Sequence, residues 1–292
     1  MTAGPAESAG PEPLVIADFA APEVLDQIVT STGVSISLAG DGRDRALQVR
    51  VRPFSEHGNR WPYIFFTDAY FPEPIDLSVY SRVTATIRNV TEGLATVRVT
   101  MSSKPYNDGG RNLEGEGFVI PGGTTMQCDL STSLFRRPMN DPSSIQGLMF
   151  VFPPNELNAV YRIDRIDAVY DPVEGSPADR LKADVDDVGG QIGSLEERVD
   201  WDAVPAERAA ALRARIPELS EAVDQIRERA EAAGTGGWRG AYQENRDALD
   251  VIERRLGEFA LADKTGFHLW HRPPYTYCYR NALPDFESST VD

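Results

Sequence analysis

The sequence predicts a β-sandwich of the jelly-roll type followed by an α-helical hairpin or a three-helix bundle. Apolar residues alternate with a period of two from Leu14 to about Asp171, and after Glu174 the period becomes helical. Alternation is typical of strands with one buried face, and the longer period is typical of amphipathic helices. We therefore expect a multidomain chain that combines an all-β part with an all-α part.

The β part consists of short apolar runs separated by polar turns such as Gly40–Gly42, Asn89–Gly93 and Pro121–Gly123. No helical pattern lies between these runs, which argues against a parallel α/β sheet. Roughly ten strands in such a series suit a jelly-roll. The expected strands are LVIADF, VSISLAG, ALQVRVRPF, WPYIFFTDAYF, RVTATIRNV, ATVRVTMSS, EGFVIPGG, TTMQCDL, IQGLMFVF and YRIDRIDAVY.

The helical part is expected to hold three amphipathic helices. Ser176 and Pro177 fit an N-cap followed by proline at the first helical position. Alternating spacings of four and three residues indicate heptad seams, which at about 20 residues are too short to be stable alone. The apolar positions are Leu181, Val185, Val188, Ile192, Leu195 and Val199, then Leu212, Ile216, Leu219, Val223, Ile226 and Ala230, then Tyr242, Leu249, Ile252, Leu256 and Phe259.

Pro217 lies inside the second of these runs. Proline removes a backbone donor and clashes with the preceding turn, so a kink or a break is expected near Arg215 and Ile216. The expected organisation of the whole chain is a disordered leader at 1–12, a sandwich at 13–173, a helical region at 177–262 and a β-like segment at 263–292. That last segment is interpreted as the start of a further domain or as a returning strand.

The charge of the chain restricts its partners. The formal net charge is −16, with 45 acidic and 29 basic residues. Such a chain repels phosphate backbones, so nucleic acid is not expected as a partner. It has no continuous apolar stretch long enough to cross a bilayer, so no membrane insertion is expected. The N-terminus lacks the features of a signal peptide, which predicts a cytoplasmic protein, or an extracellular or cell-surface one if a signal was removed.

No motif of a catalytic site is present. The sequence lacks the patterns GxSxG, HExxH, GxxxxGK[ST] and GxGxxG. Cys128 and Cys278 have no metal-site spacing and are expected to be free thiols. His57, His268 and His271 are interpreted as surface or interface histidines. No catalytic residue is predicted.

The densest aromatic segment begins at the loop before Trp61. Alternation places Trp61, Tyr63 and Phe65 on one face of a strand, and Ile64 and Phe66 on the other. Two interpretations remain open, a buried central strand or a platform on which a sugar ring stacks. The buried central strand is favoured. If most of these rings lie in the core, the main candidates for binding a sugar are the polar residues Glu56 to Arg60, which we call the polar lip, together with Trp61. The candidate carbohydrate-binding residues are Glu56, Asn59, Arg60, Trp61, Lys104, Tyr106, Asn107 and Arg111.

Two acids lie on the first and last expected strands of the sandwich, Asp18 and Asp167. In a jelly-roll these strands are neighbours. Calcium prefers several oxygen ligands, so a structural calcium there is one hypothesis, and ordinary exposed carboxylates are the other.

An ordered series of segments resembles a known family. Asp76–Tyr80 reads DLSVY, Ile145–Leu148 reads IQGL and Ile166–Val169 reads IDAV, after an opening LVIADF. This series is similar to carbohydrate-binding-module-like β-sandwiches of the galactose-binding-domain type, which are found attached to multidomain glycoside hydrolases. The resemblance covers about residues 12–172 and implies a polysaccharide or oligosaccharide partner.

The functional expectation is a non-catalytic carbohydrate-binding or accessory module of a polysaccharide-processing protein, such as the N-terminal part of a glycoside hydrolase-like protein. One alternative is a structural protein that self-associates through its helices. Another is a polysaccharide-active hydrolase or lyase.

Overall fold

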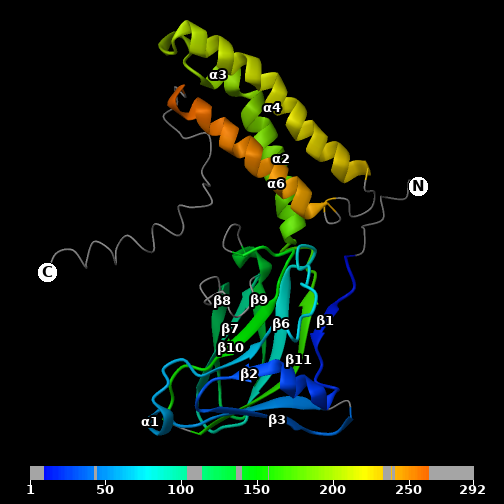
Figure 1. Ribbon diagram of the computed structural model, residues 1–292, viewed down its shortest axis with the longest axis vertical. Helices are drawn as coiled ribbons and strands as arrows, with labels where there is room; N and C mark the ends of the chain where they lie inside the picture. The colour runs from blue at the N-terminus through cyan, green and yellow to red at the C-terminus, as the bar shows by residue number, and fades with distance from the viewer. Residues whose placement is uncertain are drawn as a thin grey trace, which may run out of the picture. The chain divides into compact units, whose positions relative to one another are not determined.

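The computed structural model describes residues 10–42, 45–103, 114–135, 140–156, 158–232, 238 and 241–262. The chain divides into two compact units, residues 1–177 and 178–292. The first unit is built from two antiparallel sheets and the second from helices (Figure 1). The predicted combination of a jelly-roll-type β-sandwich with a helical region is confirmed. Among the described residues, no helix is long and apolar enough to cross a membrane.

The first sheet has six strands and is organised around one long central strand, β11. On one side β11 pairs with β6, and on the other it pairs first with β4 and then with β1. The spatial order is β3-β4-β11-β6-β9. The strands are β1 (Leu14–Ala17), β3 (Val34–Ala39), β4 (Ala46–Val51), β6 (Arg82–Asn89), β9 (Thr125–Ser131) and β11 (Ala159–Val169).

The second sheet has five strands in the order β2-β5-β10-β7-β8. All ten predicted runs form strands, and the structure adds β2, which is too short to show a pattern in the sequence. The strands are β2 (Ile28–Thr30), β5 (Tyr63–Phe66), β7 (Ala95–Ser102), β8 (Glu114–Ile120) and β10 (Gly147–Val151). Short helices η1 (Pro22–Gln27), α1 (Phe54–His57) and η4 (Thr132–Leu134) lie between strands.

The core of the sandwich lies between the two sheets because each strand buries alternate residues. In β6, Val83, Ala85 and Ile87 are at most 1% exposed, whereas Arg88 is exposed. Inward-facing residues of the second sheet, such as Phe66 and Phe150, join the same apolar cluster. Burial of this large apolar cluster is the dominant stabilising term for the unit.

The helical unit is held together by the predicted seams. The predicted seam positions are buried in a single apolar cluster, except that Ala230 is buried outside the cluster and Ile216 is only partly buried against it. Three long helices therefore share one core, as expected of a three-helix bundle. The helices are α2 (Pro177–Gly193), α3 (Leu195–Arg198), η5 (Trp201–Ala203), α4 (Ala206–Ala232), α6 (Tyr242–Leu256) and η6 (Gly257–Ala262).

A largely buried arginine on α6 adds an ionic cluster to this bundle. The Arg246 guanidinium lies 3.2 Å from Asp184 of α2, 2.8 Å from Asp250 and 3.3 Å from Glu253. Burial alone would lower the pKa of Arg246, but these three carboxylates more than offset it, so the pKa is raised. The cluster links α2 to α6 across the apolar core.

Of the two outcomes predicted at Pro217, the break is wrong, because α4 continues from Ala206 to Ala232 with Pro217 inside it, and the kink stays a prediction. Packing explains the difference. Leu212 and Leu219, on either side of the proline, are at most 3% exposed, so burial on both sides holds one continuous helix. The predicted leader up to residue 9 and the predicted segment 263–292 lie outside the described residues.

Candidate functional site

The two faces of β5 have different surroundings, and this separates core residues from candidate binding residues. Ile64 and Phe66 belong to the main core, whereas Phe65 forms a separate cluster with Met149 and Val151, against which Tyr63 packs. The predicted alternation is confirmed. Tyr63 and Phe65 lie on the outer side of the second sheet, whereas Phe66, Phe71 and Tyr80 of the same segment belong to the main core.

Strand pairing extends this outer side across four strands. Residues that pair across a ladder lie on the same face of a sheet. One row runs from Tyr63 to Val151, Arg98 and Gly117. The next row runs from Phe65 to Met149, Thr100 and Gly115. We call the face formed by these eight residues the aromatic face.

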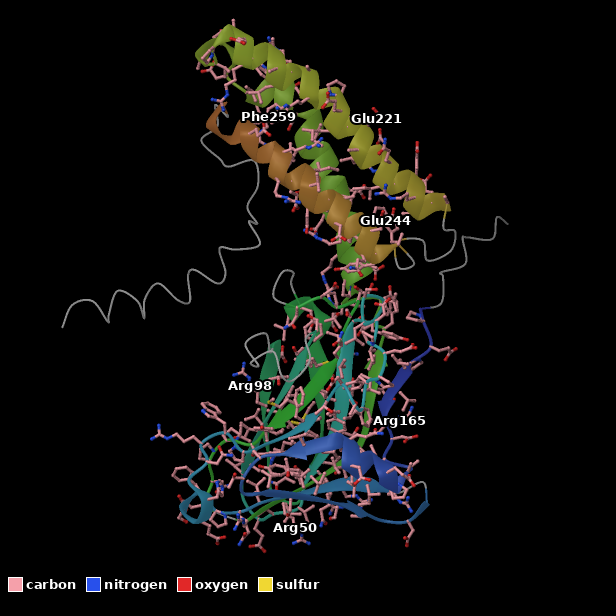
Figure 2. All side chains as sticks on the ribbon, in the orientation of Figure 1. Arg50, Arg98, Arg165, Glu221, Glu244 and Phe259 are labelled. Carbon is pink, nitrogen blue, oxygen red and sulfur yellow. The ribbon has the colours of Figure 1, made fainter. Side chains whose placement is uncertain are left out.

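The aromatic face combines mostly buried apolar side chains with one exposed cation. Phe65, Met149 and Val151 are 2–9% exposed and Tyr63 is partly exposed. The Arg98 side chain is exposed, and its label in Figure 2 marks it at the side of the sheet. A sugar ring needs exposed apolar surface for its C–H face and polar groups for its hydroxyls, and on this face the partly exposed Tyr63 and the exposed Arg98 could supply them.

Two glycines shape this face in opposite ways. A side-chain carbon added to Gly117, in the row of Arg98, would meet no atom within 4 Å. At Gly147 of β10, an added carbon would meet the Phe65 ring at 2.7 Å. Glycine at 147 therefore lets the Phe65 ring lie flat over β10, and Gly117 leaves space beside Arg98.

The predicted polar lip is an ordered loop that leads into the aromatic face. The Asn59 side chain donates to Ser31 Oγ and to the Thr32 carbonyl, both at 3.1 Å, and accepts from the Trp61 backbone at 3.0 Å. The His57 ring accepts a hydrogen bond from the Asn59 backbone at 2.9 Å. These bonds fix the backbone of Trp61, whose side chain is 64% exposed.

The described residues give the predicted binding residues different roles. Glu56 and Arg60 are exposed near Trp61, whereas the Asn59 amide already bonds within the loop. Lys104, Tyr106, Asn107 and Arg111 lie outside the described residues. Four residues of this face, Arg98, Thr100, Met149 and Val151, were not predicted from the sequence. The unbroken apolar run LMFV in β10 was a signal, since it requires apolar cover on both faces of that strand.

The hypothesis of a structural calcium at Asp18 and Asp167 stays a prediction. Strand β1 does pair with β11, and Asp167 lies opposite Val15. However, both carboxylates already have partners. Asp167 accepts two hydrogen bonds from the Arg165 side chain, at 2.7 and 2.8 Å, and Asp18 accepts one from the backbone N–H of Ala20 at 3.1 Å. Within the described part of the chain, no group of three or more acidic, histidine or cysteine side chains is arranged to hold a metal ion.

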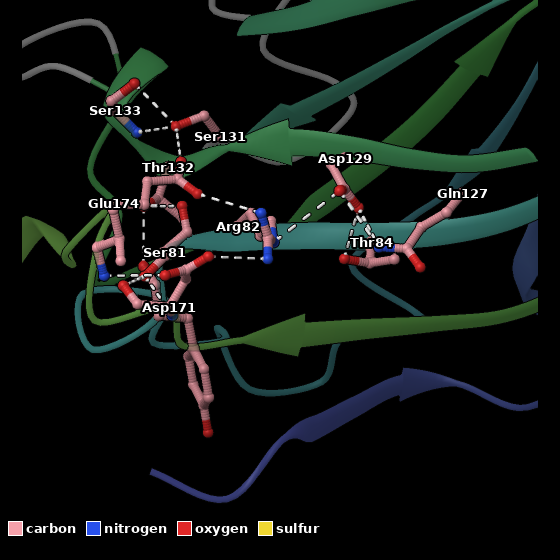
Figure 3. Close-up of polar contacts among 12 residues, drawn as sticks. Ser81, Arg82, Thr84, Gln127, Asp129, Ser131, Thr132, Ser133, Asp171 and Glu174 are labelled. Carbon is pink, nitrogen blue, oxygen red and sulfur yellow. Dashed lines mark hydrogen bonds and ion pairs between the residues drawn. The ribbon is translucent and has the colours of Figure 1, made fainter. Parts of the chain in front are cut away.

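A second polar cluster lies where β11 ends. Arg82 approaches three carboxylates, those of Asp171 at 3.1 Å, Glu174 at 3.7 Å and Asp129 at 3.9 Å (Figure 3). Ser81 Oγ donates to the Asp171 carbonyl at 3.0 Å and accepts from its backbone N–H at 2.8 Å. The cluster therefore fastens the chain beyond β11 onto β6 and β9, which is a structural role.

Comparisons with known proteins bear on the sandwich only. No protein-family model matches this chain, and no curated protein matches it. A family 11 carbohydrate-binding module from Clostridium thermocellum is similar in structure, with a TM-score of 0.40 and 15% identity over 54% of this chain and 95% of that one. A family 28 module specific for non-crystalline cellulose has a TM-score of 0.40 and 12% identity, covering 56% and 97% of the two chains.

An exo-β-agarase is also similar, with a TM-score of 0.41 and 13% identity over 56% of this chain. This chain matches only 25% of the agarase. Carbohydrate-binding modules are the family that the sequence resemblance indicated. At these scores the fold assignment rests on the two sheets themselves.

Proposed function

We propose that the chain is a non-catalytic carbohydrate-binding module that serves as an accessory part of a polysaccharide-processing protein. Its ligand is an uncharged polysaccharide or oligosaccharide, held on the aromatic face with Trp61 at the edge. The observation that carries the proposal is the exposed Trp61 ring on a fixed backbone, at the start of the strand that supplies Tyr63 and Phe65.

The chemistry of the face supports an uncharged glycan. Leaving the large Trp61 ring 64% exposed forgoes the free energy of its burial, and a stacked sugar ring would recover part of it. Arg98 offers an exposed polar group beside the apolar row. Since Arg98 is the only charged residue of the aromatic face, recognition would depend on stacking and hydroxyl bonds rather than on charge.

The test is affinity electrophoresis of the full chain through gels that contain mixed-linkage β-glucan, xylan or agarose. We expect at least one of these polysaccharides to retard the wild-type protein. Trp61→Ala should weaken that binding by about tenfold to a hundredfold, since an exposed aromatic anchor contributes about 1.4–2.8 kcal/mol. The variant should fold normally, because an exposed ring leaves no cavity when it is removed.

Gly117→Val gives a second, independent test. The Cβ atom of the added side chain would meet no atom within 4 Å, and the side chain would block a ligand beside Arg98. Valine also favours strands over glycine, so the variant should be at least as stable as the wild type. Gly190→Ala is the matched control, because Gly190 lies on α2, where an added carbon also meets no atom within 4 Å.

Loss of binding in Gly117→Val with normal binding in Gly190→Ala would support the aromatic face. Wild-type migration unchanged in every gel would refute the binding of an uncharged polysaccharide. Binding that survives both Trp61→Ala and Gly117→Val would place the glycan elsewhere.

The structure offers less support for assembly through the helices. The heptad positions are already buried inside one chain, so they leave no seam for a partner. For example, Leu195 is 0% exposed, and Leu195→Asp should therefore unfold the helical unit rather than change the mass of an oligomer.

A further inference from the structure

The outer face of the first sheet gathers arginines in an otherwise acidic chain. Arg162 of β11 lies directly opposite Arg88 of β6, and Arg50 of β4 lies opposite Val160, two residues before Arg162. All three point away from the core, since Val49, Ile87 and Ile163, one position along each strand, are 0% exposed. We call the surface of Arg50, Arg88 and Arg162 the arginine face.

The pairing of Arg88 with Arg162 is unfavourable for folding by itself. Like charges directly opposite each other on neighbouring strands destabilise a sheet. Arg162 is compensated by Asp164, whose carboxylate lies 3.1 Å from its Nε atom. Among the described residues, no acidic group lies within 4 Å of Arg88, and Arg88 is exposed.

The charge of Arg50 is likewise not compensated by an acidic group among the described residues. The part of the chain that the structure describes gives Arg50 no carboxylate within 4 Å, and the Gln48 amide, turned so that its oxygen faces Arg50, offers a neutral partner at 3.1 Å. Other arginines of the same sheet are neutralised: Arg165 by Asp167, and Arg82 by three acids. Figure 2 labels Arg50 and Arg165 on this unit.

The chain has 45 acidic residues, so carboxylates to pair with Arg50 and Arg88 were abundant. Neighbouring positive charges that no acidic group compensates are expected at a functional position rather than at a structural one. We infer that the arginine face binds a linear polysaccharide that carries carboxylate or sulfate groups at intervals.

The geometry suits spaced negative charges on an extended polymer. With strands about 4.8 Å apart and about 3.4 Å per residue, the backbones of Arg50 and Arg88 are about 12 Å apart with Arg162 between them. Thr86 and Thr125 lie beside Arg88 and supply hydroxyl groups for sugar hydroxyls. A guanidinium binds carboxylate or sulfate through two parallel hydrogen bonds.

The negative net charge does not prevent this binding. At physiological ionic strength the Debye length is about 8 Å, so acids on distant parts of the surface are largely screened. A polymer with one charge per repeat is less repelled by the whole chain than nucleic acid, which carries a charge every ~1.7 Å along its axis.

The test compares the full chain in gels that contain polygalacturonate, dextran sulfate or uncharged dextran, at low and at physiological salt. Wild-type protein should be retarded by one or both charged polymers and not by dextran, and the retardation should weaken with salt. Retardation by polygalacturonate would indicate recognition of carboxylate groups, and retardation by dextran sulfate would indicate recognition of sulfate groups. The double variant Arg50→Gln/Arg88→Gln should bind about tenfold more weakly.

Arg208→Gln is a control for the loss of one positive charge elsewhere, since Arg208 is exposed on α4 of the other unit. It should bind as the wild type does. Thermal unfolding gives a separate readout, because Arg88→Gln removes a like-charge contact and should keep or raise the melting temperature. A clear fall in that temperature would show that Arg88 is structural and would overturn the inference.

The inference is also overturned if neither charged polymer retards the wild type at low salt, if Arg208→Gln weakens binding as much as the double variant, or if duplex DNA binds equally well. None of these outcomes depends on the aromatic face. Conversely, Trp61→Ala should leave retardation by charged polymers unchanged, so that failure of the proposed function and failure of this inference can be told apart.

Discussion

Pro217 costs the helical unit stability, and its replacement by alanine should recover much of that cost. Pro217 lies in the interior of α4 and its side chain is exposed. Its ring nitrogen carries no hydrogen, so the carbonyl of Arg213, four residues earlier, loses its helical hydrogen bond. The ring also crowds that carbonyl. Pro217→Ala restores the bond and removes no buried apolar contact.

The magnitude follows from helix propensities. Proline in a helix interior is about 3 kcal/mol less favourable than alanine. Proline also restricts the unfolded chain, which offsets about 0.4–1 kcal/mol of that penalty. The net gain should therefore be about 2 kcal/mol. For a unit of this size, this corresponds to a rise of about 8–16 °C in its melting temperature.

The assay is thermal and urea unfolding of the full chain, followed by circular dichroism at a wavelength dominated by helix. Glu218→Ala is the matched control, because Glu218 is the exposed neighbour of Pro217 and because glutamate and alanine both favour helices. Its stability should change by less than about 0.5 kcal/mol. An unchanged or lowered stability for Pro217→Ala would refute the reasoning and would show that the proline stabilises α4 through a contact of its own.

Three further predictions concern buried groups. Arg246→Met should destabilise the helical unit by roughly 3 kcal/mol in urea titrations, because it leaves three carboxylates without their cation; a neutral result would show that those acids find other partners. In the sandwich, burial raises the pKa of Cys128 from 9.0 to about 12 and that of Tyr161 from 10.0 to about 12. The unfolded chain loses these protons first, so sandwich stability should fall as the pH rises from about 9 to 12. A melting temperature that stays constant over that range would contradict this. The native Cys128 thiol should also resist a thiol reagent at pH 8 until the protein unfolds.

Much of this architecture could be predicted because it depends on local periodicity. The alternation in β6 and the heptad spacing from Leu181 to Val199 each determine which residues are buried. The strand β2 has only three residues, too few for a period to be recognised. A break at Pro217 was one of two expected outcomes, and it does not occur because propensity acts locally, whereas burial of Leu212 and Leu219 acts on the whole helix.

The candidate sites could be predicted only in part. Trp61 was found from composition, because an aromatic residue next to polar turn residues is conspicuous in a sequence. Arg98, Met149 and Val151 were missed because they join Tyr63 only through the strand order β5-β10-β7, which brings together residues about 35 to 90 positions apart. The arginine face has the same origin, since Arg50, Arg88 and Arg162 come from three strands that only the sheet places side by side.

The sequence by itself determined the elements, their buried faces and the division into a sandwich and a helical unit, because backbone period and apolar spacing are local properties. The tertiary structure alone decided which strands are neighbours, and therefore which side chains share a surface. Strand order depends on the packing of distant segments, and no spacing along the chain records it. For this reason β5, which the sequence predicts as a buried strand, also forms one edge of the candidate binding face.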